Sequence, residues 1–438
     1  MQATPGSVSS ASIGHRSEWP VSLQVDRHAA IGKCVAVVEP HVSGHRSIWT
    51  HWISEQLAAK GWSVVVLTLQ KSLDEPAGQW MRSAPEGVGV IAVPDDVENS
   101  LNHETRALFS LDLRYYRLLQ RMLRAVLDRS RSVDVVFLPF GDYGLYSAAA
   151  LGSPFGSIPW ASVVMRPAFH YASMGIVAPR PSFAWVRRLA FQKYLRIRSL
   201  AACFTVDEPL FEFLRSRRVA AQKIQYLADP IDLNSAGPTQ SRTFGIGLGQ
   251  ITVLVYGTLN RRKGVGCLLD AMTALARTDV HILCVGKQDA DFSDALNSPV
   301  ARRLSSTGRL HVQAGWADAQ TEAAAFEVAD IVWLGYRGHF QSSGVLVQAG
   351  RAGLPVIGCR EGIIGWTVER HRCGKVVDVE NPAAVAAAVD ELAGSGELRT
   401  VLGENGRSAF SGHSVHAAGE RISRALQAAT LGRSVVDI

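Results

Sequence analysis

This sequence of 438 residues lacks several patterns that would assign it to a narrow class of protein. It has no run of about 18 consecutive apolar residues, so we expect no transmembrane helix. The first 30 residues are polar and contain several serines but no apolar stretch, which argues against a secretory signal. We therefore expect residues 1–30 to form a disordered tail and the protein to be cytoplasmic.

The six cysteines are scattered and form no C-x-x-C motif, so neither a zinc site nor a disulfide framework is predicted. We find no Asp-x-Asp motif in a setting typical of a metal site, and the nearest acidic run, Pro94–Asp96, precedes a loop. No Ser-His-Asp or Cys-His arrangement suited to hydrolysis is recognisable. We expect neither a metal nor another cofactor.

The charge balance limits the possible partners only loosely. Lysine and arginine total 45 against 39 acidic residues, and this net charge of +6 suits a nucleotide sugar or an anionic membrane surface. Nucleic acid would also be attracted, but the basic residues follow no recognition motif, so we expect no nucleic-acid partner. The chain is long enough for two domains, and its 47% hydrophobic content is ordinary for an α/β protein.

Short apolar runs alternate with helical patterns in the first half of the chain, which predicts a parallel sheet with helices on its faces. A helix is expected to end at Gly61 and a long one to span about 102–130. The predicted strands are Lys33–Pro40, Ser63–Leu69, Val88–Pro94, Val133–Phe140, Trp160–Tyr171 with its exit loop, and two more in 200–232.

Polar residues and one glycine follow these strands at the edge where open α/β sheets bind ligands. Gly44 follows the first strand, Asp142 the fourth, and Arg166 and His170 the fifth. Each also has an ordinary interpretation: Gly44 suits any tight turn, Asp142 could cap a helix, and a lone histidine is usually structural. Because three polar side chains leave neighbouring strand ends, we expect them to face one site.

A stretch rich in glycine, serine and threonine, Leu233–Gln250, predicts a linker between domains. After it the alternation restarts, which predicts a second doubly wound sheet. Its expected strands are Ile251–Gly257, Val280–Gly286, Leu310–Gly315, Ala329–Tyr336, Leu354–Cys359 and Gly374–Val379.

Two loops of this second half have the features of an anion site. In Tyr336–Gly365 a strand leads through Ser342-Ser343-Gly344 into a helix, whose free N–H groups and positive dipole end favour a phosphate. In Tyr256–Gly264 a lysine, Lys263, stands at a helix start, where a fixed cation would oppose the charge of a departing pyrophosphate. An ordinary capped helix and a solvated basic turn remain the alternatives.

These two loops resemble the donor-binding segment of GT-B glycosyltransferases, in particular the retaining glycosyltransferase family 4. The similarity is strongest across Gly249–Leu392 and weaker across Ile31–Asp232. It implies two Rossmann-like doubly wound domains facing a central cleft. Residues 31–235 would form the acceptor-side domain, residues 236–412 the nucleotide-sugar-binding domain, and a helix at 413–431 would pack back on the first.

The sequence departs from the family pattern at two places. Where the family has Gly-Arg-Leu, three residues and Lys-Gly, Thr258 replaces the arginine, and Arg261 or Arg262 would have to supply its charge. The second glutamate of the family corresponds to Gln348, and the first has no equivalent. A non-catalytic nucleotide-sugar-binding relative or a partner subunit therefore remains an alternative to an active enzyme.

The resemblance implies transfer of a sugar from a nucleotide sugar to a sugar, lipid-linked or small-molecule acceptor, with retention and without metal, in glycan, polysaccharide or glycolipid assembly. The catalytic candidates are Lys263, Arg262, Asp142, His170 and Arg166. The donor-binding candidates are Gly44, Gly257, Thr258, Gly315, Trp316, Ser342, Ser343, Gly344, Gln348, Gly362 and Gly365.

The segment Arg180–Leu200 combines six cations with aromatic and leucine side chains and contains no acid. Basic amphipathic helices of this kind bind anionic lipid, which would make the protein peripheral at the inner face of the membrane. The alternative is a helix that packs on its own sheet and turns its charges to water.

Overall fold

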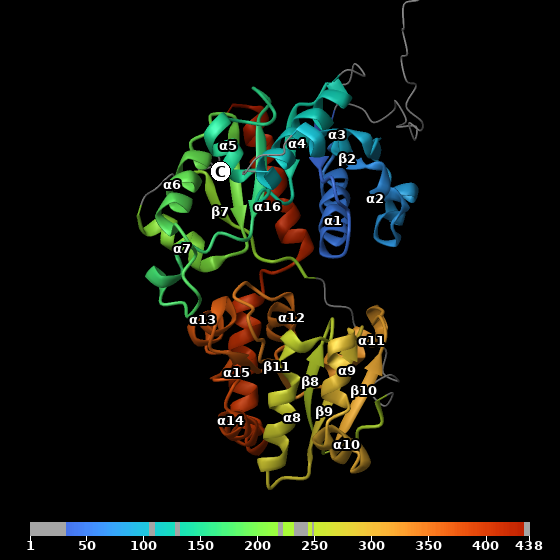
Figure 1. Cartoon of the computed structure of the whole chain (residues 1–438), viewed down its shortest axis with the longest axis vertical. Helices are drawn as coiled ribbons and strands as arrows, with labels where there is room; N and C mark the ends of the chain where they lie inside the picture. The colour runs from blue at the N-terminus through green and yellow to red at the C-terminus, as the bar shows by residue number, and fades with distance from the viewer. Residues whose placement is uncertain are drawn as a thin grey trace, which may run out of the picture.

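The computed structural model describes residues 32–104, 110–127, 132–217, 222–231, 244–247 and 249–432. The expected tail at 1–30 and most of the expected linker, Leu233–Gln250, lie outside these residues. Figure 1 shows two units stacked along the long axis of the molecule, each built on its own sheet. This is the predicted α/β class with two Rossmann-like sheets.

The first sheet has the order β3-β2-β1-β4-β5-β6-β7, and every neighbouring pair is parallel. The strands are β1 (Cys34–Val38), β2 (Ser63–Leu69), β3 (Val88–Val93), β4 (Val135–Leu138), β5 (Trp160–Val164), β6 (Leu200–Thr205) and β7 (Ile224–Tyr226). Helices cover both faces, so the central strands are buried on both sides and read as continuous apolar runs.

The helices of the first unit are α1 (His45–Ala59), α2 (Gln70–Asp74), α3 (Asp96–Glu104), α4 (Ser110–Leu127), α5 (Leu145–Leu151), α6 (Ala184–Leu195) and α7 (Glu208–Ser216), with 3₁₀ turns η1 (Pro76–Ser83) and η2 (Tyr171–Met174). The single helix expected over about 102–130 is described as two elements, α3 and α4. Residues 105–109 between them lie outside the described part of the chain.

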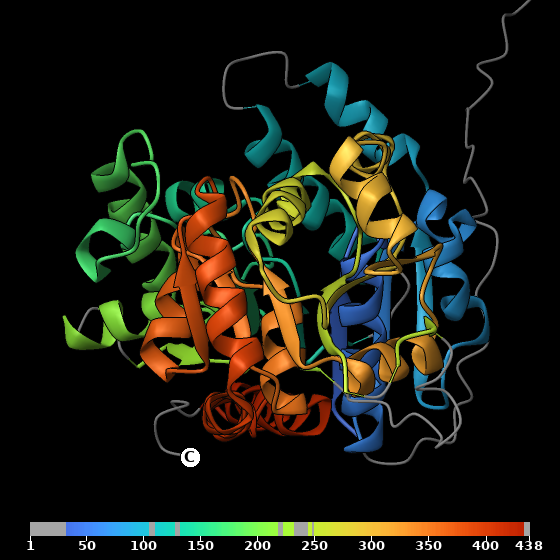
Figure 2. The ribbon, with the colours of Figure 1, turned by 90° about the horizontal axis from the view of Figure 1, so that it is seen from below.

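The second sheet has the order β10-β9-β8-β11-β12-β13 and is also parallel. Its strands are β8 (Ile251–Tyr256), β9 (Val280–Gly286), β10 (Leu310–Ala314), β11 (Ile331–Leu334), β12 (Val356–Cys359) and β13 (Gly374–Val377). Its helices are η4 (Arg261–Lys263), α8 (Val265–Ala274), α9 (Ala290–Leu296), α10 (Pro299–Ser306), α11 (Ala319–Val328), α12 (Gly344–Ala352), α13 (Gly362–His371), α14 (Pro382–Gly394) and α15 (Gly396–Phe410). Figure 2 shows this unit from below, in front of the first.

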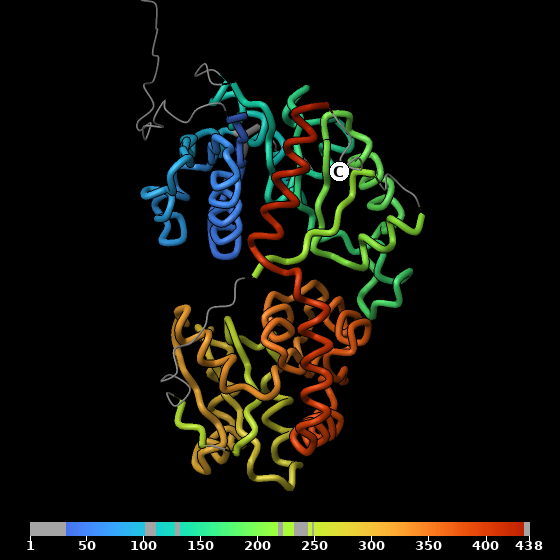
Figure 3. Tube along the Cα trace, turned by 180° about the vertical axis from the view of Figure 1, so that it is seen from behind, coloured from blue at the N-terminus to red at the C-terminus, as the bar shows by residue number. Residues whose placement is uncertain are grey.

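The last described helix, α16 (Val415–Thr430), returns from the second unit to the first. Figure 3, seen from behind, shows it in red on the near side of the first unit, beside α1. Ile422 and Leu426 are buried in the same core cluster as the strands of the first sheet. Trp62 Nε1 donates to Ser423 Oγ at 2.9 Å, which fixes the helix against the end of α1. The chain therefore passes between the units twice.

Among the described residues, no helix combines the length and the apolar character that crossing a bilayer requires.

Candidate active site

The carboxyl ends of both sheets meet at a cleft of about 610 Å³ between the two units. The loops after β4, β5 and β7 and the start of α1 form one wall, and the loops after β8 and β11 form the other. The predicted residues brought together here are Asp142, Arg166, Gly257, Thr258, Arg262, Lys263, Ser342, Ser343 and Gly344. Residues far apart in the sequence thus share one site.

Lys263 is held rigidly in the wall of the second unit. Its Nζ donates to the main-chain oxygen of Tyr256 at 2.7 Å and to the hydroxyl of Tyr336 at 2.6 Å. Its side chain is only 5% exposed. Trp333 Nε1 donates to the Lys263 carbonyl at 2.8 Å, so the main chain is fixed as well. A cation that is positioned in advance loses little freedom when an anion arrives.

Two glycines beside this lysine are required by the geometry of the loop. Gly257 has φ +98°, a conformation that side chains rarely adopt, and a Cβ there would lie 3.4 Å from Lys263 Nζ. Gly264 has φ +64°, and a Cβ there would lie 2.0 Å from the Gly335 carbonyl oxygen. The loop therefore needs both glycines to bring the lysine against β11.

Arg262 contributes the exposed cation of this wall. Its side chain lines the cleft, and no ion pair of its guanidinium occurs among the described residues. Thr258, which stands where the resemblance implies an arginine, also lines the cleft. Arg262 is therefore placed to supply the charge that Thr258 lacks.

The loop Tyr256–Gly264 is braced by a motif that sequence reasoning passed over. Asp289 and Asp291 form an Asp-x-Asp pair directly after β9. The carboxylate of Asp289 accepts from Asn260 Nδ2 at 3.3 Å, and that of Asp291 accepts from the Arg261 N–H at 3.1 Å. These carboxylates bind the protein's own loop, and no group of three or more metal-ligating side chains occurs within the described residues.

The N-terminus of α12 faces the cleft. Ser343 is its N-cap, but its side chain makes no capping hydrogen bond, and Ser342, Ser343 and Gly344 all line the cleft. The imidazole of His339 lies 3.1 Å from the Ser342 carbonyl and shapes the loop. A helix start with an unused serine hydroxyl suits the phosphates of a ligand.

In the opposite wall, Asp142 joins the loops after β4 and β5. Its carboxylate accepts from the N–H of Met165 and of Arg166, both at 2.9 Å. Burial raises the pKa of Asp142 to about 6, although these hydrogen bonds oppose the rise. The guanidinium of Arg166 lies 5.0 Å from the centre of the Tyr143 ring. Asp142 thus helps to set the loop that carries Arg166.

A second arginine, Arg46, was not predicted. Its guanidinium lies 4.4 Å from the centre of the Tyr143 ring and pairs with the Glu39 carboxylate at 2.9 Å. Glu39 is fully buried, and its burial raises its pKa to about 7 despite the arginine. Tyr143 therefore has a guanidinium of Arg46 and one of Arg166 against its ring. Arg46 follows the first predicted strand in the same loop as Gly44, so its position could have marked it as a candidate. Only the glycine of that loop was predicted.

Asp229 is the second residue that sequence reasoning missed. It lies after β7, lines the cleft and is 9% exposed, and burial raises its pKa to about 7. His413 Nδ1 lies 3.2 Å from its carbonyl oxygen, which ties this loop to the chain that returns through α16. The signal was a carboxylate in the stretch predicted as the last strand of the first half; the observed strand ends at Tyr226, which places Asp229 in the loop after it.

Comparisons with known proteins agree with this geometry. Residues 48–229 match the family described as "Glycosyl transferase 4-like domain", and residues 250–395 match "Glycosyl transferases group 1". The chain is a GT-B glycosyltransferase of the family 4-like type. Together the matches cover most of both units and residues on both sides of the cleft.

A curated relative, the lipopolysaccharide core biosynthesis glycosyltransferase LpsE of Rhizobium meliloti (strain 1021), is 27% identical over 160 residues. That alignment spans 36% of this chain and 44% of the relative. Sucrose-phosphate synthase from Thermosynechococcus elongatus has a TM-score of 0.64 at 16% identity, covering 91% of this chain and all of that one. HepE of Anabaena, solved in complex with UDP, has a TM-score of 0.64 at 14% identity. That match covers 90% of this chain and 100% of HepE.

One predicted catalytic residue of this glycosyltransferase is not at the cleft. His170 is fully buried, and its Nε2 lies 3.2 Å from the Asp207 carboxylate. Asp207 also caps α7 by accepting from the Leu210 N–H. The expectation that His170 faces the donor is therefore corrected: it follows the fifth strand as predicted, but the chain turns it into the core of the first unit.

Several predicted donor-binding residues also lie outside the cleft lining. Gly44 is the N-cap of α1 with φ +51°, and its neighbours line the cleft instead. Gln348 is 9% exposed within α12, and Trp316, after Gly315, is 80% exposed beyond β10. None of these four residues is among those that line the cleft.

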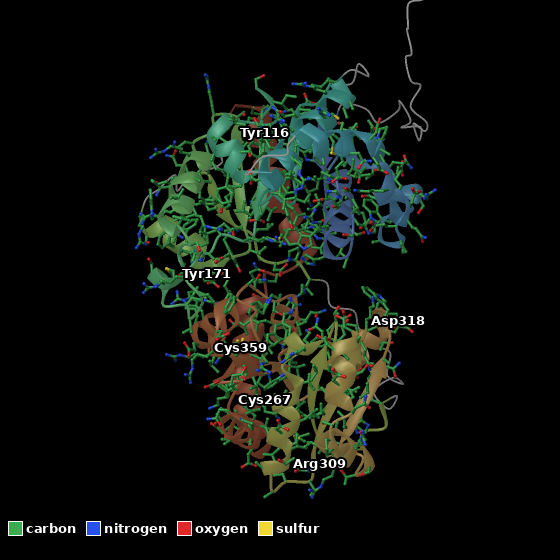
Figure 4. The ribbon with its side chains drawn as sticks, viewed as in Figure 1. Tyr116, Tyr171, Cys267, Arg309, Asp318 and Cys359 are labelled. Atoms are coloured by element: carbon green, nitrogen blue, oxygen red, sulfur yellow. The ribbon has the colours of Figure 1, made fainter. Side chains whose placement is uncertain are left out.

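Gly362 and Gly365 have a structural reason for being glycine. The Gly362 N–H donates to the Val177 carbonyl of the first unit at 2.9 Å, and a Cβ at Gly362 would lie 2.5 Å from the Phe340 Cα. A Cβ at Gly365 would lie 2.5 Å from the Arg360 carbonyl oxygen. Nearby, the hydroxyl of Tyr171 donates to the Phe340 carbonyl at 3.1 Å, at the boundary seen in Figure 4. Both glycines therefore allow close packing within the second unit, beside the place where the Gly362 N–H and the Phe340 carbonyl contact the first unit.

Proposed function

We propose that this enzyme transfers a sugar from a nucleotide-sugar donor to a second sugar in the assembly of a glycan or glycolipid. The observation that supports this most directly is the wall of the second unit. Fixed Lys263, exposed Arg262 and the free start of α12 all line one cleft there. Such a set of groups favours a diphosphate.

The chemistry follows from where negative charge develops. As the bond between the anomeric carbon and the diphosphate breaks, charge accumulates on the departing phosphate oxygen, and Lys263 and Arg262 are placed to stabilise it. The family resemblance supports retention without metal, with the leaving phosphate taking the proton of the acceptor hydroxyl. The first unit then presents the acceptor from the wall that holds Asp142 and Arg166.

A panel of UDP-, GDP- and ADP-sugars in thermal unfolding tests this function. A ligand at about one hundred times its dissociation constant stabilises the folded state by roughly 2.7 kcal/mol, a readily measured shift. Arg262→Gln should reduce this shift, whereas Arg302→Gln, at an exposed position of α10 outside the cleft, should leave it unchanged. No shift with any donor of the panel would contradict the proposal.

The acceptor is proposed to be lipid-linked or close to a membrane, as in lipopolysaccharide assembly. In α6, Phe191, Tyr194 and Leu195 are buried, so the helix packs on its own sheet. Yet Phe183 and Trp185 at its start are 74% and 67% exposed. The segment therefore packs one side of α6 on the sheet and also exposes aromatic side chains at the start of the helix. From the sequence alone, packing on the sheet and a lipid-facing surface are alternatives.

Exposed cations occur along the same segment. They are Arg180, Arg187, Lys193, Arg196 and Arg198. Exposed aromatic side chains with cations around them suit the interface of an anionic leaflet, where each cation contributes about 1 kcal/mol. We propose that the enzyme binds there peripherally, on the cytoplasmic side.

A further inference from the structure

A side chamber adjoins the central cleft within the first unit. Its volume is about 180 Å³, and its walls come from the loops after β4 and β5 and from α5 and α6. Asp142, Tyr143 and Arg166 line both the chamber and the cleft. On the far side, Tyr146 and Arg187 line the chamber and are exposed where α5 meets α6. Asp142, Tyr143 and Arg166 therefore stand between the chamber and the cleft, and the chamber borders the outer surface at Tyr146 and Arg187.

Two guanidinium groups dominate the charge of this chamber. Arg166 contacts the Tyr143 ring, and Arg187 Nη1 lies 3.5 Å from the Tyr146 hydroxyl while its Nε donates to the Ser182 carbonyl. Neither guanidinium has an ion pair within the described residues. Asp142 is the one acidic group among the described lining residues, and backbone N–H groups already occupy its oxygens. The chamber is therefore an anion-binding environment.

The remaining wall is largely aromatic. Tyr143, Tyr146 and Phe169 line the chamber, and the Phe169 ring lies 5.5 Å from that of Phe191. Aromatic faces pack well against the C–H surface of a sugar ring. The volume is below the roughly 300–1,000 Å³ of ordinary small-molecule pockets, so the chamber suits a single sugar unit.

We propose that this side chamber binds a phosphorylated sugar, with Arg166 and Arg187 on its phosphate and Tyr146 and Phe169 against its ring. The inference rests on the proposed function, because it names the class of acceptor to which the sugar in the cleft is transferred. Guanidinium groups recognise phosphate strongly, through charge-assisted hydrogen bonds that are often bidentate. A hydroxyl of the same sugar would lie toward Asp142, which also lines the cleft.

The test is a calorimetric titration of the whole protein with glucose 6-phosphate, glucose and inorganic phosphate. The donor site is first saturated with whichever of UDP, GDP or ADP stabilises the protein. Glucose 6-phosphate should bind more tightly than the other two. Arg187→Gln should weaken its binding about tenfold or more, the usual effect of losing a charged hydrogen bond. Arg196→Gln, at an exposed position at the end of α6 outside the chamber, should not change it.

Equal affinity of the wild type and Arg187→Gln for glucose 6-phosphate would overturn the proposal. Inorganic phosphate that binds as tightly as the sugar phosphate would also overturn it, since the aromatic wall would then contribute nothing. Two reciprocal variants separate this result from the donor proposal. Arg262→Gln should weaken nucleotide binding and spare the sugar phosphate, and Arg187→Gln should do the reverse. If no nucleotide binds, the donor proposal fails while the comparison of these variants still tests the chamber.

Discussion

The two walls of the cleft are built by similar sheets, yet they differ in how their polar groups are held. In the second unit, Lys263 is fixed by two hydrogen bonds and its loop by Trp333. In the first unit, Arg46 and Arg166 lie against one tyrosine ring, and carboxyl groups are buried with raised pKa values. The second wall holds a fixed cation beside a helix start, and the first combines aromatic rings with buried carboxyl groups whose pKa values are raised.

The difference has a physical reason. A diphosphate is common to UDP-, GDP- and ADP-sugars, and a helix start with a fixed cation favours its binding whatever sugar it carries. Acceptors differ from one enzyme to the next, so the side chains that face the acceptor are expected to differ in position and charge between enzymes. This accounts for recognisable sequence in the second wall and for missed residues, such as Arg46 and Asp229, in the first.

The largest expected effect is on the rigid wall. Lys263→Ala should raise the activation free energy by about two to four kcal/mol, because a preorganised charge is lost. Turnover should therefore fall roughly 30-fold to 1,000-fold. Steady-state kinetics measures the effect. Thermal unfolding is the control, since the folded variant must be compared with folded wild type. Near wild-type turnover in a folded Lys263→Ala enzyme would show that the lysine only braces its loop.

The second prediction concerns the electrostatics of the first wall. Burial raises the pKa of Asp229 to about 7, above its ordinary value near 4, so the folded state keeps a proton that the unfolded chain has lost between these pH values. Its contribution to stability therefore falls as pH rises from about 4 to 7. Relative to Asp229→Asn, wild type should lose up to about 1.4 kcal/mol per pH unit in this window.

Urea unfolding of both proteins at several pH values measures this slope. Glu39 and Asp142, whose pKa values are also raised, titrate in both proteins and cancel in the difference. Parallel stability curves from pH 4 to 8 would contradict the prediction.

A smaller effect is expected at the outer surface of the first unit. The protein should sediment with anionic vesicles, less so at high salt, and much less when Arg180, Arg196 and Arg198 are changed to glutamine. Lys287, Arg302 and Arg303 of the second unit are exposed, and their change to glutamine gives a control with the same loss of charge. Equal recovery of the protein in the supernatant with anionic and neutral vesicles at low salt would contradict membrane binding. A water-soluble acceptor would then be the better proposal.

The smallest effect concerns metal. We expect turnover to be unchanged by EDTA, because cations of the chain are placed to stabilise the diphosphate and the Asp289–Asp291 carboxylates bind their own loop. Loss of activity with EDTA and its recovery with magnesium or manganese would show that a metal ion does part of this work.

The sequence by itself determined the fold and the positions of the loops, because apolar periodicity and glycine placement are local properties. The strands at Ser63–Leu69 and Val280–Gly286 occur as predicted. The loops around Lys263 and Ser343 follow strands whose carboxyl ends must share one edge of a parallel sheet. Local pattern therefore predicted several of the residues with which the second unit lines the cleft.

Only the tertiary structure decided which way each side chain points. His170 and Arg166 lie four residues apart after one strand, yet one is buried against Asp207 and the other lines the cleft. Asp229 acquires its raised pKa through burial at the place where α16 returns, with His413 against its carbonyl. Burial and charge depend on contacts between segments nearly two hundred residues apart, and no local pattern contains them.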